Sequence, residues 1–313
     1  MTGGHSQSAG IVAENARVDA AMPPEAALRT EPSGSAPRWR LALNSLLHHR
    51  LGALGLCVCA FVVLMALVAP WIAPYDPSVS DYDAILSPPS SAHWLGTDDL
   101  GRDILSRIIW GSQVSLQVSL IAVSGAIVVG SIVGMISGYA GGWVDDVIMR
   151  VIDAMLAFPT LILALGIVAV LGPTLVNAMI AITIVNIPNF ARLVRAQVLS
   201  IRHMDFVSAA RGLGASRARI MFRHIWPSVI GNVLVYGSLT ASTALITESS
   251  LSFLGLGAQP PTPSWGSMLS SGMQYWDAWW MSVFPGFALF AVVLALNFVG
   301  DGLRDVLDSR ITE

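Results

Sequence analysis

The chain has 313 residues, of which 54% are hydrophobic and only 12% are charged, with a formal net charge of −3. Soluble domains carry about 25% charged residues, so this composition excludes a water-soluble globule. A mean hydropathy of +0.65 points the same way. We therefore expect a membrane protein without a nucleic-acid partner, and the next question is how many membrane spans the chain forms.

The N-terminal residues differ from the rest of the chain. Residues 1–37 are rich in Ala, Gly, Ser and Pro, which predicts a disordered cytoplasmic tail. A charged start followed closely by an apolar core is missing, so we do not expect a cleavable signal peptide. Residues 38–50 place Arg38, Arg40 and Arg50 around four leucines, which predicts an amphipathic helix at the membrane surface.

Long runs without charge predict six membrane-spanning helices within 51–313, because about 20 apolar residues cross the hydrocarbon core. The run 154–191 is too long for one span, and Leu171-Gly172-Pro173 divides it. The predicted spans lie near 51–73, 114–138, 151–171, 175–196, 228–254 and 283–300. A polar segment, 76–107, follows the first span, and an Arg-rich loop, 203–227, follows the fourth.

The distribution of Arg predicts the orientation of these spans. Six spans put both termini on one side of the membrane. The side of segment 76–107 carries only Arg102 and Arg107. The opposite side carries Arg38, Arg40, Arg50, Arg150, Arg192, Arg195, Arg202, Arg211, Arg217, Arg219, Arg223, Arg304 and Arg310. Because cytoplasmic loops carry an excess of basic residues, we expect both termini in the cytoplasm and segment 76–107 outside.

The Arg-rich loop contains the sequence MDFVSAARGLGASRARIMFRHIWP, residues 204–227. Residues 207–211 predict a short helix with a small-residue face that a partner could approach closely, and Gly212 allows a turn after it. Residues 215–224 predict a second helix, studded with Arg and stopped at Pro227. A protein-docking loop and a basic loop that touches lipid phosphates both fit these residues.

This loop resembles the EAA loop of ABC-importer permeases, with Ala209-Ala210, then Gly214, then Pro227. In that family the loop forms a coupling helix that fits a groove of an ATPase subunit. The resemblance implies ATPase-coupling roles for Ser208, Ala209, Ala210, Arg211, Gly214 and Pro227. The family's Glu is Ser208 here, which can form hydrogen bonds but no ion pair.

Two further segments carry a narrower resemblance. AHWLGTDDLGRDILSRIIWGSQVSL begins at Ala92, and ESSLSFLGLGAQPPTPSWGSML begins at Glu248. Both closely resemble the dipeptide/oligopeptide/nickel permease family, in particular the C-type subunit of its permease heterodimer. The resemblance covers roughly residues 38–313. It implies an all-α membrane protein of the type I importer permease fold, in the bacterial inner membrane, that translocates di- or oligopeptides. Nickel or another small solute is the alternative substrate.

The same resemblance implies the partners. They are a homologous second permease, one or two kinds of ABC ATPase, an extracytoplasmic substrate-binding protein and membrane lipid. The sequence contains no Walker motif, so we expect no cofactor or catalytic residue on this chain, with ATP and Mg on the partner ATPase. An ATP-independent transporter or channel would need no docking loop. An intramembrane enzyme would need paired catalytic residues, which the sequence does not suggest.

Several single residues carry further expectations. Glu248 is either a pathway or permease-interface residue, or a carboxylate held near the outer end of its span. Asp153 is expected to pair with Arg150 at i, i+3. Thr97 or Asp98 is expected to cap a helix that opens at about residue 102. The carboxylates of 97–103 lack the spacing of a calcium loop, so no metal site is predicted, but this outer segment could meet a binding protein.

Overall fold

The chain divides into two units, Met1–Leu41 and Ala42–Glu313. A computed structural model describes residues 50–308, all of which belong to the second unit. The predicted tail, 1–37, lies outside the described residues. So does the predicted surface helix, 38–50, apart from Arg50.

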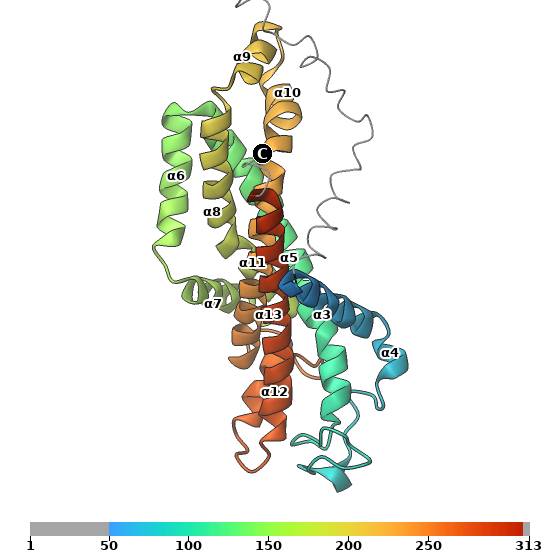
Figure 1. Cartoon of the computed structure of the whole chain (residues 1–313). Helices are drawn as coiled ribbons and strands as arrows, with labels where there is room; N and C mark the ends of the chain where they lie inside the picture. Colours follow the sequence, from blue (N-terminus) through green and yellow to red (C-terminus); the bar gives the residue numbers. More distant parts are fainter. Residues whose placement is uncertain (1–49, 309–313) are drawn as a thin grey trace, which may run out of the picture. The chain divides into compact units, whose positions relative to one another are not determined.

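Every regular element of the described residues is helical (Figure 1). The elements are α3 (Arg50–Leu67), α4 (Ala69–Ile72), η1 (Tyr82–Ala84), α5 (Ile104–Ala140), α6 (Gly142–Leu156), α7 (Thr160–Leu171), α8 (Leu175–Ile201), α9 (Asp205–Gly212), α10 (Arg217–Arg219), η2 (Ile220–Ile225), α11 (Trp226–Phe253), α12 (Trp265–Gly272) and α13 (Trp280–Asp308). Five helices of the described residues are long and apolar enough to cross a membrane, or six if α6 and α7 together form one span.

The segment predicted as the third span, 151–171, is two helices rather than one. α6 ends at Leu156, α7 begins at Thr160, and their axes differ by 92°. Pro159 stands at the N-cap of α7, and its ring and missing N–H prevent the preceding helix from continuing. The apolar composition runs unchanged through this break, so hydropathy could not reveal it. Figure 1 shows α7 lying across the direction of α6 and α8.

The expectation that a helix stops at Pro227 is wrong. Arg217–Phe253 runs as one helix through this residue. Its segment Ile220–Ile225 is a π-helix, and the N–H of Trp226 donates to the carbonyl oxygen of Met221, five residues earlier. A π turn is wider than an α turn and leaves room for a proline ring where an α-helix would clash. The Arg-rich loop, 203–227, is therefore continuous with a long helix.

The main helix pair is α5 with α8, and glycines bring the two backbones together. Gly130, Gly134 and Gly138 recur every four residues along α5. A Cβ at Gly130 would lie 2.6 Å from the Cβ of Phe190, and one at Gly138 would lie 2.9 Å from the Cβ of Val198. Small residues at this spacing let helices pack backbone to backbone. We infer that α5 and α8 move as one body.

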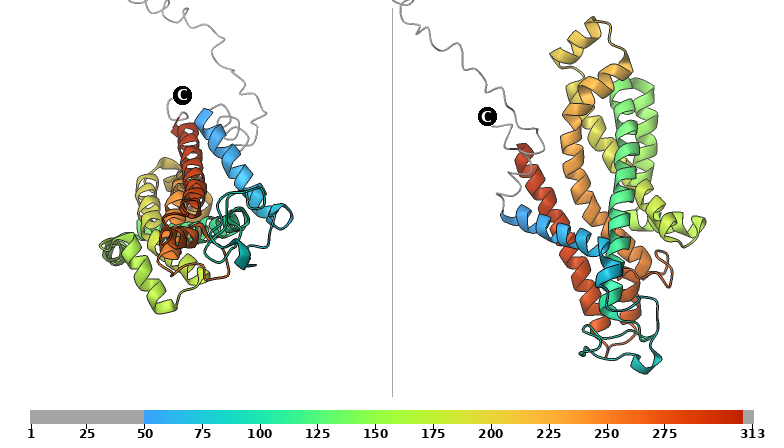
Figure 2. Two further views of the ribbon diagram at one scale, coloured as in Figure 1. Left: turned by 90° about the horizontal axis from the view of Figure 1, so that it is seen from below. Right: turned by 90° about the vertical axis from the view of Figure 1, so that its right-hand side faces the viewer.

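Two tryptophans join the loops at the end of the bundle opposite α9. The indole Nε1 of Trp265 donates to the carbonyl oxygen of Ile108 at 3.1 Å, and that of Trp280 donates to Thr97 at 3.0 Å. α12 thus contacts the start of α5, and the start of α13 contacts the connection between α4 and α5, which the right-hand view of Figure 2 shows at this end. We call this the outer end.

The cap of α5 differs from expectation. Asp103, rather than Thr97 or Asp98, is the N-cap, and its Oδ2 accepts from the Ser106 N–H at 2.8 Å. Asp98 instead accepts from the backbone N–H and Nε of Arg102, at 2.9 and 2.7 Å. This ion pair holds the chain in a turn, so the helix begins later, at Ile104.

Candidate functional site

α9 lies at one end of the bundle, and residues 202–204 join it to α8 (Figure 1). Its inner face is apolar. Val207 and Ala210, three residues apart, are 0% and 8% exposed and belong to the same apolar cluster as Ile220 and Ile225 of η2. Residues at this spacing share one helix face. Burial of that face holds α9 against η2, which leads into α11.

The other face of α9 is open. Ser208, Ala209, Arg211 and Gly212 are exposed, and Leu213, just past the helix, is 90% exposed. Further exposed guanidinium groups follow on the same loop, at Arg217, Arg219 and Arg223. The exposed surface of this loop carries small side chains and guanidinium groups, with the Asp205 carboxylate and the apolar Met204 and Phe206 also exposed. An acidic groove of a partner protein would complement it.

The turn after α9 is tightly specified. Gly214 has φ +78°, a conformation that L side chains rarely adopt. Around it, the N–H of Ala215 donates to the carbonyl oxygen of Ala210 at 3.1 Å. This six-residue closure is typical of a helix that ends at glycine. The side chain of Ser216 then caps α10, accepting from the Arg219 N–H at 3.3 Å.

The residues expected to couple to an ATPase therefore do not all lie on the exposed face of α9. Ser208, Ala209 and Arg211 are exposed on α9, and Gly214 is exposed in the turn after it. Ala210 instead faces the core. Pro227 is exposed but lies in the first turn of α11 rather than in the docking helix.

Asp153 does not pair with Arg150 as expected. Its Oδ1 accepts a hydrogen bond from Nη2 of Arg192, which lies on α8. The contact joins residues 39 positions apart in the sequence, so no local spacing could reveal it. It is one of two ion pairs between α6 and α8; the other joins Asp145 to Arg195.

Glu248 is enclosed within the described residues, with 1% of its surface exposed. Its Oε1 accepts from the hydroxyl of Ser252 at 2.6 Å, one turn further along α11. That hydroxyl accepts in turn from the N–H of Ala258 at 3.2 Å. The carboxylate thus links α11 to the turn after it. Both expectations for Glu248, a pathway or permease-interface residue and a held carboxylate, stay predictions.

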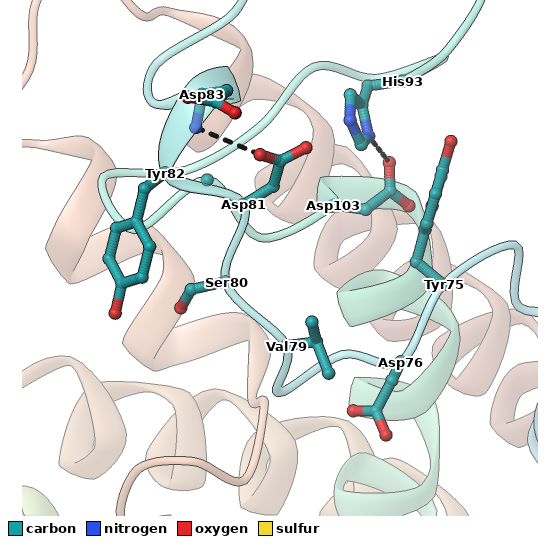
Figure 3. Close-up of a pocket in the computed structure, with 10 residues that line it drawn as sticks. Tyr75, Asp76, Val79, Ser80, Asp81, Tyr82, Asp83, His93 and Asp103 are labelled. Carbon is teal, nitrogen blue, oxygen red and sulfur yellow. Dashed lines mark hydrogen bonds and ion pairs between the residues drawn. The ribbon is translucent and has the colours of Figure 1, made fainter.

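A cavity of about 540 Å³ opens at the outer end. Figure 3 shows the side chains that line it. Its lining residues are Tyr75, Asp76, Val79, Ser80, Asp81, Tyr82, Asp83, His93, Gly101 and Asp103. Nδ1 of His93 lies 3.0 Å from Oδ1 of Asp103, and the ring centroids of His93 and Tyr75 are 4.8 Å apart. Sequence reasoning marked this segment as polar and outward-facing but did not foresee the cavity.

The cavity does not look like a metal site. Within residues 50–308 no group of three or more His, Cys, Asp or Glu side chains is placed to hold a metal ion. Carboxylates with tyrosine rings beside them suit an organic cation instead, because an ammonium or guanidinium group can bind both.

Comparison with protein families decides the identity of the fold. Residues 126–313 match the family described as the binding-protein-dependent transport system inner membrane component. The chain belongs to this family. Residues 37–89 also match the N-terminal transmembrane domain of oligopeptide transport permease C. The expected membership in an ABC-importer permease family, and with it the inner-membrane location, is confirmed. As a permease, the chain is the membrane component of its transport system and not the ATPase.

Curated relatives of this permease share its length. A dipeptide transport system permease protein, DppC, from Alkalihalophilus pseudofirmus is 46% identical over 87% of this chain and 90% of the relative. A di/tripeptide permease from Pseudomonas aeruginosa is 45% identical over 84% of this chain and 89% of its own. A glutathione permease, GsiD, from Pectobacterium atrosepticum is 43% identical over 80% and 85%.

A solved structure shares the fold of the permease. The MetNI methionine ABC transporter, in an inward-facing conformation, matches with a TM-score of 0.54. The match covers 65% of this chain and 97% of the other at 19% sequence identity. This likeness concerns the fold alone, and it confirms the expected all-α permease class.

Proposed function

We propose that this chain is the C-type permease subunit of an ATP-driven importer that carries di- or oligopeptides across the inner membrane. The observation that carries the substrate class is the 46% identity to a dipeptide permease over 87% of the chain. Relatives named for di/tripeptides and for glutathione, itself a peptide, support the same class.

The energy enters through the exposed face of α9. Ser208, Ala209 and Arg211 form the surface that docks on the ATPase, and Gly214 shapes the turn behind it. The support is geometric: the inner residues Val207 and Ala210 are buried and hold the helix, while the outer side chains are exposed and accessible to a partner. ATP and Mg bind to the partner ATPase.

Two further proteins complete the importer. A homologous second permease lies beside this chain in the membrane lipid, with the peptide path between the two subunits. A substrate-binding protein docks at the outer end, where the acidic cavity bordered by Tyr75 and Tyr82 would receive a basic side chain. In this arrangement α9 and both termini face the cytoplasm, as the Arg distribution indicates.

Transport follows from rigid-body alternation. Closure of the ATPases on ATP displaces α9, and the packed pair of α5 and α8 moves with it between inward-open and outward-open states. This permease thus binds and guides peptide but makes no covalent change to it.

Uptake in a strain that lacks this chain tests the substrate. We expect loss of labelled dipeptide uptake, recovery with the wild-type gene, and nickel uptake equal to that of the parent strain. Loss of nickel uptake with normal peptide uptake would refute the peptide assignment and favour the metal branch of the family.

A further inference from the structure

α6 lies between two points where the backbone changes direction. Gly141 stands before it and Gly142 is its first residue, with φ +65° and +54°, and a side chain at Gly142 would meet nothing within 4 Å. Glycine at positive φ has little restriction on its backbone. After α6 comes the 92° break that precedes Thr160. The covalent chain therefore does little to set the orientation of α6.

Apolar packing also contributes little to the orientation of α6. Asp145 and Ile152 are the only buried residues of α6, while Trp143, Val147 and Val151 are 76%, 55% and 57% exposed. Half-buried apolar residues such as Ile148 and Met149 add some contact, but a helix with two buried residues gains little van der Waals packing from its neighbours. Polar contacts therefore contribute much of what fixes α6.

That role falls to an ion pair with α8. Nε and Nη2 of Arg195 donate to the two carboxylate oxygens of Asp145, each at 2.6 Å. The hydroxyl of Ser137, near the end of α5, donates to the same carboxylate. Asp145 is 8% exposed, so water competes little for it. Bidentate pairs of this kind are strong and fix the relative orientation of the two groups.

The second ion pair between the two helices is weaker. The side chains of Arg192 and Asp153 are 51% and 57% exposed. Solvent and salt screen such pairs, and many contribute nothing measurable. The Asp145–Arg195 pair is therefore the main connection, and Asp153–Arg192 offers a matched comparison on the same two helices.

α8 is also the helix that leads to α9. Only residues 202–204 separate them, so a displacement of α9 acts directly on the end of α8. Nη1 of Arg202 donates to the carbonyl oxygen of Gly138 at 2.9 Å, which joins the ends of α8 and α5. α5 follows α8 through this bond and the glycine packing. α6 is tied to α8 by the Asp145–Arg195 pair and by the more exposed Asp153–Arg192 pair.

We infer that Asp145 and Arg195 are positioning residues that lock α6 to α8, so that displacement of α9 by the ATPase also moves α6. The inference rests on the proposed coupling role of α9. It adds the Asp145–Arg195 ion pair, called the joint below, as the connection between α6 and α8. Without this ion pair, the ATPase continues to hydrolyse ATP, but α6 no longer moves together with α8.

The test uses the complete importer, reconstituted with its second permease, ATPases and binding protein. The measured quantity is peptide transported per ATP hydrolysed, in Asp145→Asn, Arg195→Gln and the double variant. Each single change should lower this ratio about tenfold, with assembly intact. The double variant should be no worse than either single one, because both remove the same joint. Asp153→Asn should keep the wild-type ratio.

A distance measurement separates positioning from general destabilisation. Spin labels at Val147 on α6 and Ser200 on α8, in a chain with Cys57 and Cys59 replaced by Ala, report the separation of the two helices. We expect one narrow distance in every nucleotide state of the otherwise wild-type chain, and a broad distribution after Asp145→Asn. Asp145→Glu, which keeps the charge, should restore much of the order.

Three results would overturn the joint: a wild-type transport ratio in Asp145→Asn, an equal loss in Asp153→Asn, or recovery in the double variant. Failure of the proposed function looks different. In that case the unaltered importer takes up no peptide at all, while the spin-label distance still tests whether Asp145 holds α6 to α8.

Discussion

At the scale of single residues, two glycines of the docking loop differ in what they require. Gly214 needs its positive φ, which costs an L side chain about 1–2 kcal/mol. Gly212 is helical, and a Cβ there would meet nothing within 4 Å. No contact among the described residues explains why position 212 carries glycine, so we attribute it to the close approach of a partner.

Gly212→Ala tests that attribution. Alanine favours a helix over glycine by about 1 kcal/mol, so thermal stability should stay equal or rise. ATPase association should nevertheless weaken, because a methyl group now stands in the interface. Thermal unfolding of the purified chain and ATPase binding in membranes measure the two effects. Unchanged binding would mean that the partner does not approach the backbone at this point.

Glu248 leads to a second residue-scale prediction. Gln at this position keeps an oxygen that can accept from Ser252, so Glu248→Gln should leave peptide uptake within about twofold of wild type. Glu248→Ala leaves the serine hydroxyl without its acceptor and should lower stability by about 1–3 kcal/mol. Uptake assays and thermal unfolding distinguish these outcomes. A sharp loss of uptake in an assembled Gln variant would instead place the carboxylate on the peptide path.

At the scale of elements, the close approach of α5 to α8 can be tested with two glycines. Gly134→Val places two methyl groups against the carbonyl oxygen of Ala191 and the Cβ of Val194. Such overpacking costs about 1–3 kcal/mol or more, so the unfolding temperature should fall clearly. Gly166→Val, in α7, meets nothing within 4 Å and should leave it unchanged. Equal unfolding temperatures would argue against backbone contact between α5 and α8.

The sequence predicted these elements unevenly. Runs without charge locate most of the long helices, because crossing a membrane is a local requirement of length and composition. The sequence did not predict the break before Thr160, because Phe158 and Pro159 continue an apolar run. The passage of the helix through Pro227 depends on π-helical hydrogen bonds, which have no compositional signal.

The features of the candidate site were also predictable from the sequence only in part. The small and basic residues of the docking loop are consecutive, so their presence on one loop could be predicted. Their division into a buried and an exposed face depends on where η2 packs. Ion pairs across helices, such as Asp145–Arg195, join residues 50 positions apart and become visible only in the fold.

At the scale of the whole molecule, the orientation predicted from Arg can be measured by cysteine labelling. Val79 at the outer end is 64% exposed, and Ala218 on the docking loop is also exposed. In a chain with Cys57 and Cys59 replaced by Ala, a membrane-impermeant maleimide should label Val79→Cys in intact spheroplasts. Ala218→Cys should react only after the membrane is opened. The reverse pattern would invert the topology.

The exposed face of α9 is the centre of the account, and copurification tests it most directly. The tagged wild-type chain should come out of membranes with a second permease and an ATPase. Ala209→Glu, which adds bulk and negative charge to the small-residue surface, should release the ATPase while the second permease stays bound. Val79→Glu, at the outer end, should retain both. If the wild-type chain purifies alone, or if Ala209→Glu keeps the ATPase, the coupling role assigned to α9 is contradicted.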